Sequence, residues 1–222
     1  KSQKYHHGLW KSQKSFLNFV KTKNLTDSTI FQSKFNEMKS SYNHYCHIYT
    51  DGSKDGDTVA AAAVTGQHIS KSRLPIGASI FSAELKAIDL AFNYINESYK
   101  KQFIIFSDSL SSLQAIDGMK DDNPLVLQLL NKYNVLCKEN TIVLCWLPGH
   151  TGISGNDKAD KAAKVALSLN ISFFKLPFTD FKSNINKYIF SSWQSSWDLA
   201  IHNKLHYIKP KLGEWHPSNR II

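Results

Sequence analysis

The chain has 222 residues, 42% of them hydrophobic and 12% aromatic, which is enough for one packed domain with extensions and excludes global disorder. No run approaches the ~18 apolar residues of a membrane helix, and the N-terminus has no hydrophobic signal core. We therefore expect no membrane association and an intracellular location, in the cytoplasm or the nucleus. The three cysteines, Cys46, Cys137 and Cys145, are odd in number and far apart, which argues against a disulfide framework or a zinc knuckle. Because the sequence begins at Lys1 rather than Met, we expect it to be a piece of a longer polypeptide.

The net charge of +9 is concentrated at the two ends of the chain. Residues 1–44 have 8 Lys and 2 acidic residues (+6), residues 45–170 have 12 Lys or Arg and 13 acidic residues (−1), and residues 171–222 have 7 Lys or Arg and 3 acidic residues (+4). Basic arms around a near-neutral centre indicate either a polyanionic partner or lysine-rich tails that serve solubility alone, and charge leaves both open. We expect three parts: a basic N-terminal extension or connector, a central domain, and an aromatic-rich helical C-terminal extension.

The first part of the chain predicts a helix and then an antiparallel meander. Four apolar residues are spaced for one face of a short helix that Ser28 can cap: Ile30, Phe31, Phe35 and Met38. Residues 51–57, DGSKDGD, have the composition of a turn. Three short strands surround and follow this turn, at residues 46–50, 58–65 and 67–74. Because the connections between them are short, neighbouring strands must run antiparallel.

The second part alternates helices with strands. A helix over residues 82–98, with Ser82 as N-cap, has an apolar stripe at Leu85, Ile88, Phe92 and Ile95. Two further strands are expected at residues 102–107 and 141–147. Three further helices are expected at residues 109–117, 123–137 and 157–169. An antiparallel meander followed by alternating helix and strand predicts an α/β domain with a mixed sheet and helices on its faces.

The C-terminal segment has a helical repeat of its own. Starting near Thr179, apolar residues recur every four positions, at Ile185, Ile189, Trp193 and Trp197. For this stripe we favour packing against the domain over stacking on nucleic-acid bases, because aromatic side chains are mostly core residues.

Four acidic residues occupy positions where sheet proteins gather active-site groups. Asp51 and Asp108 each follow a buried strand, whereas Glu84 and Asp160 lie near the starts of helices. Each position alone is ordinary, since acids are common in turns and in first helical turns. Their order suggests convergence on one site for hard divalent cations, which prefer oxygen ligands. Two such ions about 3.5–4 Å apart can clamp the attacking and leaving oxygens of a phosphodiester.

Four segments around these acids resemble the type 1 ribonuclease H family. They are YTDGS (49–53), SAELKAI (82–88), FSDSL (106–110) and WLPGHTGISGNDKADKAA (146–163). The resemblance covers about residues 46–168 and implies the ribonuclease H-like fold, with a five-stranded mixed sheet of three antiparallel and then two parallel strands. It also implies hydrolysis of the RNA strand of an RNA–DNA hybrid with two Mg²⁺ ions, or Mn²⁺ in their place.

The resemblance implies a role for each matching residue. Asp51 bridges both metal ions, Glu84 and Asp108 complete the site near the leaving group, and Asp160 holds the ion that activates water. His150 matches the family's mobile-loop histidine, which we favour over a plain surface histidine. Asn156 and Ser109 are expected to contact the substrate, and Asp157 is expected to be a helix-start acid rather than a ligand.

Two departures from the cellular enzymes point to a subgroup. Residues 118–140 lack the basic, tryptophan-bearing handle that grips the hybrid, and Ile80 and Phe81 replace amide side chains that contact RNA. Both departures, together with the C-terminal tryptophans, resemble the ribonuclease H domain of non-LTR retrotransposon polyproteins. This implies a covalent link to a reverse transcriptase. Two alternatives are an inactive ribonuclease H-like binding or connector module, and a DNA-acting nuclease or integrase of the same superfamily.

Overall fold

The computed structural model describes residues 28–66, 68–119 and 122–213. The predictions for residues 1–27, which include most of the basic extension, and for the terminal residues 214–222 lie outside this range. The described chain forms two compact units, one ending at Pro177 and the other beginning at Phe178. The three-part organisation over residues 1–44, 45–170 and 171–222 stays a prediction. Of the helices described, none is both long and apolar enough to cross a membrane.

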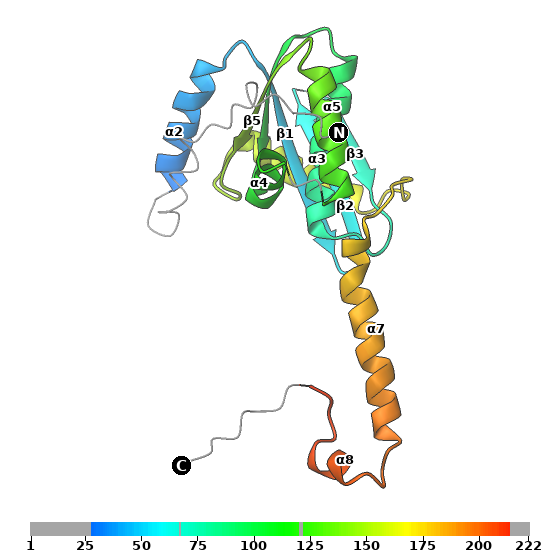
Figure 1. The fold of residues 1–222 in the computed structure, drawn as a ribbon. Coiled ribbons are helices and arrows are strands. Elements are labelled where there is room, and N and C mark those ends of the chain that lie inside the picture. The colour runs from blue at the N-terminus through cyan, green and yellow to red at the C-terminus, as the bar shows by residue number, and fades with distance from the viewer. Residues whose placement is uncertain (1–27, 67, 120–121, 214–222) are drawn as a thin grey trace, which may run out of the picture. The chain divides into compact units, whose positions relative to one another are not determined.

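The first unit is built on a five-stranded mixed sheet (Figure 1). Its strands, in chain order, are β1 (Cys46–Asp55), β2 (Thr58–Thr65), β3 (His68–Arg73), β4 (Gln102–Ser107) and β5 (Thr141–Trp146). In space the order is β3-β2-β1-β4-β5, with β1, β2 and β3 antiparallel and β1, β4 and β5 parallel. This confirms the predicted fold class.

Helices cover both faces of the sheet. They are α2 (Ser28–Ser41), α3 (Ile80–Glu97), α4 (Leu110–Asp117), α5 (Pro124–Leu136) and α6 (Ser154–Ala166). Successive residues of β2 point to opposite faces, yet Val59 through Thr65 are all buried. Since α3 and α6 both contact β1 and β2, one helix covers each face, and the four alanines Ala60–Ala63 let both approach closely.

Strand β1 is longer than the sequence predicted. Residues 51–55 were expected in a turn, but they continue the strand because each pairs with β2, from Asp51 opposite Ala62 to Asp55 opposite Thr58. The turn is confined to Gly56 and Asp57. The parallel pairing with β4 nevertheless ends at Thr50 opposite Ser107, so Asp51 still follows the end of the parallel part of the sheet.

Two helices begin earlier than predicted. The N-cap of α3 is Ser79, not Ser82, because the Ser79 side chain accepts a hydrogen bond of 3.1 Å from the Ser82 backbone N–H. Ser82 itself is fully buried. Helix α6 starts at Ser154 rather than Asp157, so Gly155 and Asn156, which precede the predicted helix, lie in its first turn.

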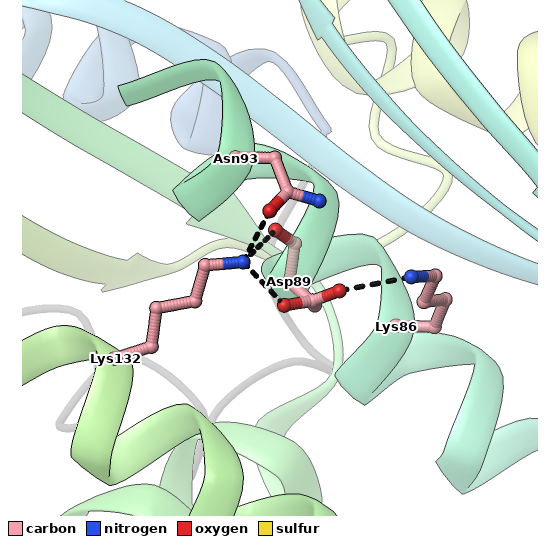
Figure 2. Close-up of polar contacts among 4 residues, drawn as sticks. All are labelled: Lys86, Asp89, Asn93 and Lys132. Carbon is pink, nitrogen blue, oxygen red and sulfur yellow. Dashed lines mark hydrogen bonds and ion pairs between the residues drawn. The ribbon is translucent and has the colours of Figure 1, made fainter. Parts of the chain in front are cut away.

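A buried acid joins α3 to α5. Asp89 is 8% exposed, and its carboxylate lies 2.7 Å from Lys132 Nζ on α5 and 2.9 Å from Lys86 Nζ on its own helix (Figure 2). Lys132 also donates to Asn93. Burial alone would raise the pKa of Asp89, but the hydrogen bonds and charges of the two lysines hold it below its ordinary value. This acid is therefore a structural anion inside a clamp of two cations.

The second unit contains the predicted C-terminal helix. Helix α7 (Phe178–Asp198) is followed by the short α8 (Lys204–Ile208). The chain after α8 returns to α7, where Trp197 Nε1 donates to the Lys209 carbonyl over 2.8 Å. The predicted packing of the α7 stripe on the domain stays a prediction.

Candidate metal centre

Adjacent strands bring the first and third acids together. Asp51 lies on β1 one residue after the last parallel pair with β4, and Asp108 directly follows β4. Glu84 reaches the same place from α3, because α3 crosses β1 at Gly52. A side-chain carbon at Gly52 would lie 2.9 Å from the Glu84 backbone nitrogen, so only glycine allows this approach without a shift. In the sequence YTDGS, the acid Asp51 is thus followed directly by Gly52, the glycine that allows Glu84 to approach it.

These three acids form one cluster. Asp51, Glu84 and Asp108 each offer a carboxylate oxygen, and these oxygens all lie within 4.8 Å of one another. Asp51 is 6% exposed and Glu84 9% exposed, whereas Asp108 is half-buried. The Oε2 atom of Glu84 is buried and has no hydrogen-bond partner among the described residues. Three converging carboxylates with an unsatisfied oxygen match the donor set that hard divalent cations prefer.

The electrostatics of the cluster also fit a cation. Burial, with the negative charges of Asp51 and Asp108, raises the pKa of Glu84 to about 9, although a hydrogen bond from the Gly52 backbone opposes the rise. Burial and the charges of Asp108 and Asp160 raise the pKa of Asp51 to about 7. Without a positive charge among them, these carboxyls therefore keep protons near neutral pH. A divalent ion would supply that charge and favour the ionised forms.

The fourth predicted acid stands beside the cluster rather than in it. Asp160 contributes to the raised pKa of both Asp51 and Asp108, so it faces the same region. Its own carboxylate, 23% exposed, accepts a hydrogen bond of 2.8 Å from Lys164, one turn along α6. The pairing in turn raises the pKa of Lys164. The neighbouring acid Asp157 lies in the first turn of α6, as predicted for a helix-start acid.

Several groups orient Asp108. Asn156 is 3% exposed, and its amide donates to Asp108 Oδ2 over 3.3 Å. Trp146 Nε1 donates to the Asp108 carbonyl over 3.0 Å, and a side chain at Gly149 would meet Asp108 Oδ2 at 2.6 Å. Burial raises the pKa of Asp108, and the Asn156 hydrogen bond and the charge of His150 oppose that rise. Asn156 therefore contacts a cluster acid, and its predicted contact to the substrate stays a prediction.

The remaining predicted site residues lie at the rim. His150 is exposed in the loop between β5 and α6, and its backbone has a φ of 57°, a left-handed conformation. Ser109 is half-buried, and its hydroxyl donates to Ser112 Oγ over 2.8 Å. Sequence reasoning did not single out Trp146 or Lys164 as site residues. The signals were present, since Trp146 opens the quoted loop motif and Lys164 follows Asp160 at the i,i+4 spacing of helical ion pairs.

Comparison with known proteins agrees with this architecture. Residues 43–168 match the family model described as RNase H. The chain is 32% identical over 129 residues to the Pol polyproteins of equine infectious anemia virus, isolates 1369 and CL22 and strain Wyoming. These matches cover 57% of this chain and 11% of each polyprotein, so the chain spans a small part of the curated relatives that it matches.

Proposed function

Because the chain belongs to the RNase H family, we propose that it hydrolyses the RNA strand of RNA–DNA hybrids with two divalent cations bound by its acidic cluster. The observation that carries the proposal is the convergence of Asp51, Glu84 and Asp108, whose oxygens lie within 4.8 Å of one another. The buried Oε2 atom of Glu84, for which the described part of the chain offers no hydrogen-bond partner, supports it further. Mg²⁺ is the proposed ion, with Mn²⁺ as a substitute, since both accept all-oxygen ligand sets.

Each acid has a proposed place around the cations. Asp51 would bridge the two ions, Glu84 and Asp108 would complete the site on the leaving-group side, and Asp160 would serve the side of the attacking water. The bound cations would activate that water and stabilise the charge that develops on the phosphate. Asp160 is paired through its Oδ2 atom with Lys164 over 2.8 Å, so Lys164 would compete with a cation for this carboxylate.

The residues around the acids have supporting roles. Asn156 and Trp146 hold Asp108 at its side chain and its backbone, which limits the motion of one ligand. His150, which is exposed and follows the glycine that lies against Asp108, would assist proton transfer at the leaving oxygen or release of the product. The expected products are a 5′-phosphate and a 3′-hydroxyl.

Preference for RNA would depend on contacts to the ribose 2′-hydroxyl, since this group distinguishes RNA from DNA. Ile80, at the first position of α3, is 43% exposed and offers no side-chain hydrogen bond. Ser109 lies at the rim of the cluster and has a hydroxyl. We propose that Ser109 and backbone groups, rather than side chains at the start of α3, make these contacts.

The test is a cleavage assay with matched acid variants. Labelled RNA–DNA hybrid, double-stranded DNA and double-stranded RNA are each incubated with the protein in EDTA, Mg²⁺ or Mn²⁺. We expect cleavage of hybrid RNA alone, and only with the cations. Asp51→Asn and Asp108→Asn should each lower the rate at least about 100-fold, as loss of a group that stabilises the transition state does. Asp157→Asn, on the same helix turn as Asp160 but outside the cluster, is the control and should retain the rate.

The outcomes separate the alternatives. Cleavage of duplex DNA would favour a DNA-acting nuclease or integrase of the same superfamily. Binding of hybrid without cleavage under any cation would favour an inactive binding or connector module. Equal loss of rate in Asp157→Asn and Asp51→Asn would contradict the assignment of the cluster.

We also propose that the domain works within a longer polyprotein, linked to a reverse transcriptase and acting inside the cell. The relatives that support this are Pol polyproteins of a virus, whereas the sequence motifs suggest a non-LTR retrotransposon. The class of retroelement therefore stays a prediction.

A further inference from the structure

Helix α2 touches the loop that carries His150. The Gln32 side-chain amide donates a hydrogen bond of 2.8 Å to the Thr151 carbonyl, across 119 residues of sequence. The next residue, Gly152, has a φ of 73°, and a side-chain carbon there would lie 2.5 Å from Gln32 Nε2. The Gln32 amide thus lies close against the loop backbone at the residue after His150 and at the following glycine.

The packing of α2 fixes where Gln32 can reach. Phe31 and Phe35, on either side of Gln32 in the sequence, are 2% and 4% exposed. The Phe35 ring lies edge-on to Phe106, with 5.3 Å between centroids, and 6.5 Å from Tyr49. Tyr49 and Phe106 stack on each other, and each lies two residues before a cluster acid. Helix α2 is therefore held by the same strands that position Asp51 and Asp108.

The loop needs such support. His150 has a left-handed backbone, which is uncommon for a residue other than glycine and persists only where the surroundings hold it. Within the loop, the Thr151 hydroxyl donates to the Pro148 carbonyl over 3.0 Å, which closes a turn around Gly149 and His150. The bond from Gln32 joins this turn to the core from outside. Residues 43–168 match the family model, so Gln32 comes from a segment that precedes the matched domain.

We propose that Gln32 is a positioning residue, which holds the loop in the conformation that presents His150 to the acidic cluster. Its action on catalysis rests on the proposed function. A purely structural role would instead affect the stability of the whole unit and would not depend on His150.

Three variants of α2 separate these roles. Gln32→Glu keeps the shape but replaces the donor by an acceptor facing the Thr151 carbonyl, and Gln32→Ala removes the group. Ser33→Ala, at the exposed neighbour, is the matched control. The first readout is hydrogen–deuterium exchange of the amides of residues 149–153. We expect exchange there to rise about three- to tenfold in both Gln32 variants, the effect of losing one ordinary hydrogen bond, with the urea midpoint and the exchange of β1 and β4 unchanged.

The second readout is kinetic and uses His150. Gln32→Glu should lower kcat on hybrid about three- to tenfold with little change in KM. In a His150→Ala background, the same substitution should lower kcat no further, because residues that act through one another are not additive. Unchanged exchange in the loop, an equal kcat loss with and without His150, or a rise of exchange throughout the unit would each overturn the proposal. Absence of cleavage by the wild-type protein would refute the proposed function instead, while the exchange data would still decide whether Gln32 holds the loop.

Discussion

Glu84→Gln is expected to make the cation-free protein more stable while it abolishes hydrolysis. Glu84 is 9% exposed, and burial beside two other acids raises its pKa from 4.5 to about 9. The unfolded chain releases this proton near pH 4.5, whereas the folded protein keeps it to about pH 9. The stability that the protonated form contributes is therefore fully present below pH 4.5 and is lost as the pH rises towards 9.

The magnitude follows from the width of that interval. At about 1.36 kcal/mol per pH unit, the raised pKa of Glu84 alone should cost the wild-type protein about 3 kcal/mol of unfolding free energy between pH 6 and pH 8, and that of Asp51 should add about 1 kcal/mol. Glutamine is neutral at every pH, so Glu84→Gln should lose only the smaller part that comes from Asp51, whose pKa is about 7. At pH 8 in EDTA the variant should accordingly be the more stable protein. With saturating Mg²⁺ the order should reverse, because the ions stabilise the folded wild-type protein by mass action.

The measurement is urea unfolding in EDTA and in Mg²⁺ at pH 6 and pH 8. Asp89→Asn is the matched control, since Asp89 is also a buried acid of α3 but lies between two lysines (Figure 2). The pKa of Asp89 is held below its ordinary value, so the ionised carboxylate stabilises the fold at both pH 6 and pH 8. Asp89→Asn should therefore lower the unfolding free energy by about 2 kcal/mol at both pH values. A wild-type stability that is equal at pH 6 and pH 8 in EDTA, or a Glu84→Gln variant that is less stable there, would refute the reasoning.

Two further substitutions test the surroundings of the site. Lys164→Met frees Asp160 from an ion pair of 2.8 Å. Because exposed pairs are worth less than about 1 kcal/mol, the Mg²⁺ concentration for half-maximal cleavage should fall by at most about fivefold. A rise in that Mg²⁺ concentration would contradict this. Phe35→Ala removes a side chain of a residue that is 4% exposed and should lower the unfolding free energy by about 3 kcal/mol. The control is Phe178→Ala, at a residue that is 71% exposed, and it should change the unfolding free energy by less than about 0.5 kcal/mol. Equal effects of the two phenylalanine changes in urea unfolding would show that α2 does not stabilise the first unit.

The strand pattern was predictable because it depends on local signals. Runs of apolar residues marked β4 and β5 to within one residue, and the acids that follow β1 and β4 had to meet because parallel strands end at one edge. The helix starts were less predictable. Ser79 and Ser82 are both acceptable caps, but it is the Ser79 side chain that accepts from a backbone N–H of the first turn, whereas Ser82 is buried within the helix.

Contacts between distant segments left no signal in the sequence. The bond from Gln32 to Thr151 joins residues 119 positions apart, and a glutamine on a helix has no spacing rule that names its partner. In the same way, DGSKDGD has the composition of a turn, and its first five residues become strand only because β2 is present to pair with them. Tertiary pairing here overrides local preference.

The arrangement of the acids suggests how cations would enter the site. Three acids are crowded and at least two of them hold protons near neutral pH, because their pKa values are raised to about 7 and about 9. The fourth, Asp160, is partly exposed and has Lys164 as its counter-charge. Cations that bind all four acids would therefore displace protons from the buried cluster and compete with a lysine at its rim. Both competitors weaken as the pH rises, since carboxyls lose their protons first and the lysine later. The apparent affinity for cations must then increase with pH, which is the behaviour of a site whose ligands are deprotonated by the metal that they bind.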